Sequence, residues 1–141
     1  MPVSLPTTRP MKTFLTTTLL LLLTLPVFAA DPIAKTEITH VDPKAAAALI
    51  DEKKVTILDV RTDAEYKDGH LANAINHDFT EDDFKTQIDT LDKEKPYLIH
   101  CQSGARSAKS LKAFKALGFK HIYHLDGGIS AWKDASLPVT K

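Results

Sequence analysis

The chain has 141 residues, of which 18 are basic and 18 are acidic, so its formal net charge is zero. A balanced charge gives no electrostatic reason to expect binding to nucleic acid or to an anionic membrane surface. The length suits one domain with one core, and we expect no second domain.

The first 29 residues are predicted to be a cleaved signal peptide. They carry cations at Arg9 and Lys12, no acidic residue, and an apolar run over 14–28 that ends in small residues. An uncleaved membrane anchor is the less favoured alternative. Threonines and a proline interrupt the run, and it is shorter than the roughly 20 residues that a spanning helix needs.

Cleavage is expected after Ala29, with the position after Ala30 as the second choice. The remaining domain, 30–141, has 16 basic and 18 acidic residues and therefore a net charge of −2. We expect this domain to be periplasmic or secreted, without stable membrane association. Met11, which is followed by a lysine, is an alternative start of the chain.

Short apolar runs alternate with helical stretches along the rest of the chain. The predicted strands are 55–60, 72–76, 97–100 and 121–125. Helices are predicted to begin at Asp42–Pro43, Thr62 and Thr80, to run from the loop after Cys101 to Gly118, and to resume after Gly127–Gly128. Asp42, Thr62 and Thr80 are the expected N-caps, and Glu65 is spaced to complete a capping box with Thr62.

Strand and helix in alternation predict an α/β domain with a mainly parallel sheet and helices on both faces. In such sheets ligands bind beyond the carboxyl ends of the strands. Cys101 follows directly on the strand 97–100, so we expect it at that edge. In the next helix, the predicted apolar face is Ala108, Leu111, Phe114 and Leu117.

Cys101, in the sequence HCQSGARS, is the only cysteine of the chain. Exported proteins usually pair their cysteines in disulfides, and a single cysteine has no partner within its chain. It is therefore either a small buried hydrophobic residue or a thiol that is retained for its reactivity. The neighbouring residues distinguish these two interpretations.

A short loop between a strand and a helix directs several backbone amides, and the positive end of the helix, toward one point. Gly104 can adopt the backbone angle that such a loop requires. The helix end alone lowers a cysteine pKa by about one unit, and the amides and Arg106 add to this. The loop thus favours an activated sulfur nucleophile that also holds an anion.

Three segments follow in order along the chain: ILDVRTDAEYKDGHLANAIN, HCQSGARS and HIYHLDGGISAW. Together they resemble the rhodanese family of sulfurtransferases over essentially the whole of 30–141. The resemblance implies a single, monomeric rhodanese-like domain with a five-stranded sheet and no bound cofactor. It also implies that one cysteine takes a sulfane sulfur from a small donor such as thiosulfate, as a persulfide, and passes it to cyanide or a thiol.

Carried onto this chain, the resemblance makes Cys101 the sulfur carrier. The rest of the active loop, whose backbone amides would surround the persulfide, is Gln102, Ser103, Gly104, Ala105 and Arg106. Arg106 has two roles open to it, binding the anionic donor or bracing the loop. Some thiosulfate-using members carry two cations in this loop and the present chain carries one, so the preference for thiosulfate over other donors stays open.

Two other functions of the same fold compete with sulfur transfer. Related phosphatases and arsenate reductases have five residues between the cysteine and the arginine, whereas four lie between Cys101 and Arg106. The smaller loop favours a sulfur atom over a tetrahedral oxyanion. A non-catalytic binding module typically lacks the cysteine, which this chain retains.

Several other residues have a structural interpretation. Asp59 and Arg61 stand at a strand end, where an ion pair would fix the loop, although Arg61 is also a candidate contact for the donor. A charge relay through Glu65 is the weaker interpretation, and so is a general-base role for His100, which points away from its neighbour on a strand. No pair of histidines has the spacing of a zinc site, so no metal is expected. Trp132 is predicted to be a core aromatic.

Overall fold

The computed structural model describes residues 2–6, 8 and 35–141. The charged and apolar parts of the predicted signal peptide, and both expected cleavage points, lie outside these residues. In the part of the chain that is described, no helix is long and apolar enough to cross a bilayer.

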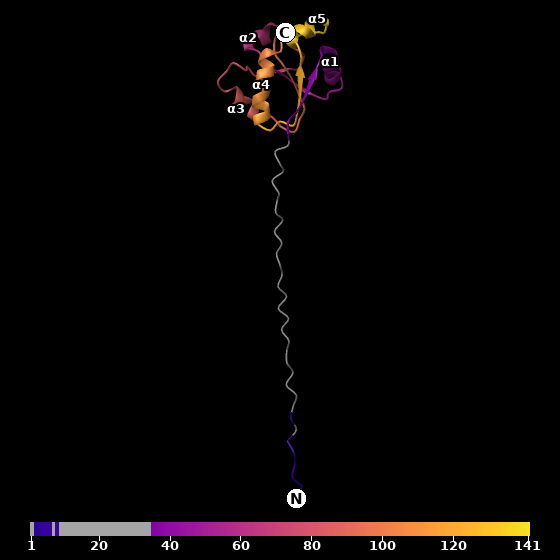
Figure 1. Cartoon of the computed structure of the whole chain (residues 1–141), viewed down its shortest axis with the longest axis vertical. Helices are drawn as coiled ribbons and strands as arrows, with labels where there is room; N and C mark the ends of the chain where they lie inside the picture. Colours follow the sequence, from indigo (N-terminus) through magenta and orange to yellow (C-terminus); the bar gives the residue numbers. More distant parts are fainter. Residues whose placement is uncertain (1, 7, 9–34) are drawn as a thin grey trace. The chain divides into compact units, whose positions relative to one another are not determined.

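Strands and helices alternate from residue 37 to residue 134 (Figure 1). The strands are β1 (Glu37–Val41), β2 (Thr56–Asp59), β3 (Ile75–Asn76), β4 (Tyr97–His100) and β5 (His121–Leu125). The helices are α1 (Pro43–Asp51), α2 (Asp63–Asp68), α3 (Phe84–Asp89), α4 (Ala105–Ala116) and α5 (Gly128–Asp134). The predicted α/β alternation is therefore confirmed.

The five strands form one sheet in the order β1-β5-β4-β2-β3, and every neighbouring pair is parallel. β4 is central, and all four of its residues are buried, as expected for a strand of a sheet that is covered on both faces. All strands therefore end at the same edge. The residue after β4 is Cys101, which confirms the predicted position of the thiol.

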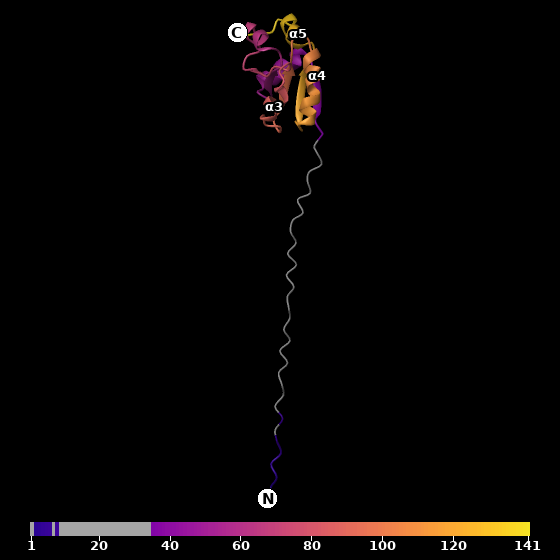
Figure 2. The same ribbon diagram turned by 90° about the vertical axis from the view of Figure 1, so that its left-hand side faces the viewer.

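A separate hydrophobic core covers each face of the sheet. On one face Phe84 and Ile88 of α3 and Phe114 of α4 pack against the strands, and Figures 1 and 2 show α4 lying alongside them. On the other face the core includes Ala46 of α1 and Trp132 of α5. Trp132 is buried, as predicted, and helices on both faces are confirmed.

Two of the three predicted helix caps are present. The side chain of Asp42 accepts a hydrogen bond from the backbone N–H of Ala45 at 2.7 Å, and Pro43 occupies the first position of α1. Thr62 and Glu65 form the complete capping box at the start of α2. These local bonds satisfy amides that have no partner within the helix.

The predicted cap at Thr80 is wrong. Asp78 accepts hydrogen bonds from both the backbone N–H and the hydroxyl of Thr80, at 2.8 and 2.7 Å. This local turn uses the groups that a cap would need, so α3 begins only at Phe84. The predicted strand over 72–76 is also shorter than expected, since β3 comprises Ile75 and Asn76 alone.

Candidate active site around Cys101

The thiol stands where β4 passes into α4, at the carboxyl edge of the sheet. Cys101 is buried, with 1% of its surface exposed. Gly104, which precedes α4, has a left-handed φ of 102° that favours glycine. The chain thereby turns back over the sulfur within three residues.

Two donors reach the sulfur directly. The backbone N–H of Gly104 lies 3.1 Å from Cys101 Sγ, and the hydroxyl of Ser107 lies 3.3 Å from it. Burial raises the pKa of the Cys101 thiol, but hydrogen bonds from Ser107 and from the backbone amides of Gly104 and Ser103 lower it by more. The pKa therefore lies below its ordinary value of 9.0, which favours the thiolate.

The first turn of α5 binds the loop through backbone hydrogen bonds. The backbone N–H groups of Ile129 and Ser130 donate to the carbonyls of Cys101 and Gln102, at 2.9 and 3.0 Å. Gly128 has a φ of 61°, and a Cβ placed there would lie 2.5 Å from the Cys101 carbonyl oxygen. A side chain at position 128 would displace the loop, so glycine is required by this close approach.

Asp59 and Arg61 form a buried ion pair below the loop. Both nitrogens of one edge of the Arg61 guanidinium face Asp59, with Nη2 2.7 Å from Oδ2 and Nε 3.0 Å from Oδ1. Nη2 also donates to the Gly69 carbonyl at 2.7 Å, and Nη1 lies 3.4 Å from Gln102 Oε1. Arg61 is only 2% exposed. It therefore supports the loop from inside the domain, through its contact with Gln102.

Arg106 is held by Glu65 of α2. The guanidinium donates to both carboxylate oxygens of Glu65 at 2.7 Å, a bidentate pair between segments that are 41 residues apart. Hydrogen bonding to Arg106 is the largest cause that lowers the pKa of Glu65, which falls to about 2. Glu65 thus bonds both to Thr62, the N-cap of α2, and to Arg106.

The Glu65–Arg106 pair predicts a pH-dependent stability that Glu65→Gln removes. Glutamine can still complete the capping box, so the variant mainly loses the charge. Because the folded pKa is lowered from 4.5 to about 2, the stabilisation is complete above pH 4.5 and is lost as the pH falls through about 2. Allowing for solvent screening of two partly exposed side chains, we expect about 1 to 2 kcal/mol at pH 7.

Urea unfolding of both proteins at several pH values measures this difference. Asp63→Asn, which removes an exposed carboxylate from the same turn of α2, is the matched control. A difference between wild type and Glu65→Gln that stays constant from pH 7 to acid would contradict the assignment.

A polar cluster that the sequence analysis missed lies behind Ser107. The Ser107 hydroxyl is 2.8 Å from Nε2 of His124, and Nδ1 of His124 is 2.9 Å from Oδ1 of Asp126. The same oxygen of Asp126 is 2.8 Å from Nδ1 of His40 on β1. Oδ1 of Asp126 therefore joins the two imidazoles in one hydrogen-bonded cluster.

The loop residues otherwise differ in what they contact. Gln102 Nε2 donates to the Ser130 hydroxyl at 3.0 Å, which adds a side-chain tie to α5. The side chains of Ser103 and Ala105 are exposed. His100 is buried and its Nδ1 lies 3.1 Å from the Cys101 carbonyl oxygen, so it faces the backbone of the loop and not the sulfur.

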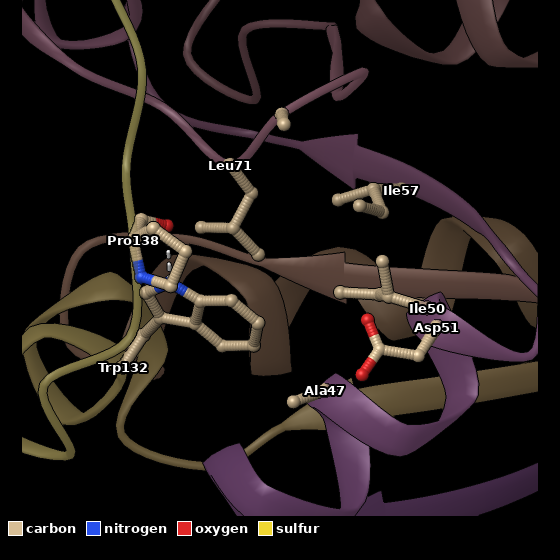
Figure 3. Close-up of a pocket in the computed structure, with 8 residues that line it drawn as sticks. Ala47, Ile50, Asp51, Ile57, Leu71, Trp132 and Pro138 are labelled. Atoms are coloured by element: carbon tan, nitrogen blue, oxygen red, sulfur yellow. Dashed lines mark hydrogen bonds between the residues drawn. The ribbon is translucent and has the colours of Figure 1, made fainter.

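A cavity of about 190 Å³ lies elsewhere in the domain, between α1 and α5 (Figure 3). Its walls include Ala47, Ile50, Ile57, Leu71, Trp132 and Pro138. The indole N–H of Trp132 donates to the Pro138 carbonyl at 2.9 Å. No residue of the loop 101–106 lines this cavity, so it is separate from the sulfur site.

Comparisons with known proteins agree with this architecture. The family model of the rhodanese-like domain matches residues 42–135. The chain is similar to a thiosulfate sulfurtransferase GlpE of Coxiella burnetii, with 32% identity over 97 residues that cover 69% of this chain and 86% of the relative. It is 28% identical over 100 residues to the GlpE of Vibrio cholerae, which covers 71% of this chain and 92% of that protein.

A solved structure resembles the domain as well. It is that of a rhodanese-related protein from Thermoplasma volcanium, with a TM-score of 0.65, 29% identity, and coverage of 72% of this chain and 97% of the other. The family model, the two relatives and the solved structure therefore all match the same domain of this chain. The chain belongs to the rhodanese-like domain family of sulfurtransferases.

Proposed function

We propose that this chain transfers a sulfane sulfur, from thiosulfate or a similar donor to cyanide or a thiol, through a persulfide on Cys101. The observation that carries the proposal is the pair of donors on the sulfur, from Gly104 and Ser107, which lower the thiol pKa. Relatives that are named thiosulfate sulfurtransferases support the same reaction class.

The reaction divides into two displacements at sulfur. The Cys101 thiolate attacks the outer sulfur of thiosulfate; a new sulfur–sulfur bond forms, and the old one breaks with its electron pair leaving on sulfite. Cyanide or a thiolate then attacks the outer sulfur of the persulfide. That bond breaks, the electron pair returns to Sγ as a thiolate, and thiocyanate or a new persulfide departs.

The loop residues divide into those that hold the anion and those that hold the loop. We assign the backbone amides of the loop to the donor anion and to the persulfide. Arg106 is assigned to bracing, because Glu65 occupies both of its terminal nitrogens, and the Glu65→Gln experiment tests this. Asp59 and Arg61 support the loop from below and are not assigned a contact with the donor.

A paired assay tests the proposed reaction against its alternatives. Thiocyanate formation from thiosulfate and cyanide is measured beside hydrolysis of an aryl phosphate, on the same preparation. Sulfur transfer that exceeds phosphate hydrolysis supports the proposal. Faster phosphate hydrolysis would favour a phosphatase of the same fold, and the absence of both activities would favour a binding module.

The location of the protein is a separate proposal. The N-terminal segment, with Arg9, Lys12 and the apolar run 14–28, supports export to the periplasm or the exterior. N-terminal sequencing of the protein recovered from its host tests this. A chain that begins after Ala29 or Ala30 supports cleavage, and a chain that begins at Met1 or Met11 contradicts it.

A further inference from the structure

A continuous line of hydrogen bonds connects the Cys101 sulfur with the protein surface. It runs from Sγ to the Ser107 hydroxyl at 3.3 Å, on to Nε2 of His124 at 2.8 Å, and from Nδ1 of His124 to Asp126 at 2.9 Å. Ser107 and His124 are buried, at 0% and 3% exposure, whereas the Asp126 side chain is 55% exposed. The thiol therefore has a preformed path for a proton.

We propose that His124 receives the proton of the Cys101 thiol through the Ser107 hydroxyl, which leaves a thiolate beside an imidazolium. The S–H bond breaks and its proton passes to Ser107 Oγ, while the hydroxyl proton of Ser107 passes to Nε2 of His124. No electron is lost or gained, and the total charge is unchanged. The proposal builds on the proposed function, because a sulfur carrier must react as the thiolate.

The partners of His124 determine which of its nitrogens can accept a proton. Nδ1 faces the carboxylate of Asp126, which is an acceptor only, so the ring proton of the neutral form lies on Nδ1. Nε2 is then free to accept from Ser107. After transfer, Nε2–H donates to Ser107, and the hydroxyl of Ser107 turns its single proton to the thiolate.

A carboxylate and a second imidazole lie against the His124 ring. The carboxylate of Asp126 contacts it directly, and hydrogen bonds from His40 and His124 hold the pKa of Asp126 below its usual range. The ring of His40 lies at 5.0 Å from that of His124, edge to face. His40 is more than half exposed, so the far end of the line is open to solvent.

Other charged groups near the loop are engaged elsewhere. His100 points to the Cys101 carbonyl and toward Asp59, and burial lowers its pKa, which favours the neutral ring. Arg106 is bound to Glu65. Among the histidines described, His124 is thus the one linked to the sulfur through a single side chain, that of Ser107. It acts on the sulfur through Ser107 and is therefore a positioning residue.

The pH dependence of Cys101 alkylation tests the proposal on the full chain, in the presence of a chelator and without sulfur donor. Iodoacetamide reacts with the thiolate, so the rate plotted against pH gives the midpoint of thiol ionisation. His124→Gln is expected to raise this midpoint by about one unit or more. His121→Gln, an exposed histidine on the same strand, is the matched control and should leave it unchanged.

A double-mutant cycle separates the relay from a general structural effect. In a Ser107→Ala background, His124→Gln should shift the midpoint much less than it does in wild type, because the connection is already broken. Equal shifts in both backgrounds, or none in His124→Gln, would overturn the proposal. Asp126→Asn, at an exposed position, provides a second variant if His124→Gln does not fold, and should also raise the midpoint. Alkylation of Cys101 requires no sulfur transfer, so the outcome of this experiment is independent of whether the proposed function is correct.

Discussion

Replacing Cys101 by serine is expected to lower thiosulfate-to-cyanide sulfur transfer by at least about 10³-fold, to the level of the buffer. A hydroxyl has nearly the same size and can accept the same two hydrogen bonds. It cannot form a persulfide, and the loop that lowers the thiol pKa does not make an alkoxide accessible at neutral pH. Thiocyanate formation measured on both proteins gives the result.

Two checks accompany this comparison. Ala108→Ser introduces the same hydroxyl on the exposed side of the first turns of α4 and should retain wild-type activity. Thermal melts of the variants verify that the fold is kept. If Cys101→Ser retained a substantial part of the transfer rate, Cys101 would not be the sulfur carrier.

The second large effect concerns stability. Asp59→Ala is expected to lower the free energy of unfolding by about 3 to 5 kcal/mol, because it leaves Arg61 charged and buried without its partner. Whole domains are stable by only about 5 to 15 kcal/mol, so the melting temperature should fall markedly. Denaturant unfolding of variant and wild type measures the difference.

Controls for this prediction use an exposed carboxylate and the partner residue. Asp68→Ala removes a side chain that is 88% exposed, and its effect should stay within about 0.5 kcal/mol. The double variant Asp59→Ala with Arg61→Met should recover part of the loss, since the uncompensated charge is gone. If Asp59→Ala were no more harmful than Asp68→Ala, the pair would not support the loop.

Local signals in the sequence predicted most of the fold. The strands β2, β4 and β5 are short apolar runs with buried residues, and the caps at Asp42 and Thr62 need only neighbours within the same turn. β1 was not predicted. It is an edge strand in which three of the five side chains are exposed, so its sequence shows no apolar pattern.

The buried face of α4 differs from the prediction for a related reason. Ala108 is exposed, whereas Ser107 and Ser110 are buried beside Phe114. Ser110 satisfies its hydroxyl at the Ser107 carbonyl, 2.7 Å away. A polar residue that finds its partner inside the fold is not distinguished by hydropathy from one on the surface.

The loop of the candidate site and the ion pair of Asp59 with Arg61 were predicted, whereas the partners of Arg106 and Ser107 were not. The thiol and the loop follow one another in sequence, and a strand followed by a short loop and a helix indicates their geometry. The contacts of Arg106 with Glu65 and of Ser107 with His124 join residues 41 and 17 positions apart. One available signal was the position of His124, a polar residue near the carboxyl end of a predicted strand, at the edge where the thiol lies.

Intact-mass measurement of the protein after treatment with thiosulfate tests the central claim most directly. The sulfur-transfer account predicts one added sulfur atom on the wild-type chain, which cyanide removes and which the Cys101→Ser variant does not acquire. A wild-type chain that acquires no sulfur from thiosulfate, or one whose added sulfur persists in cyanide, would contradict a persulfide carried on Cys101.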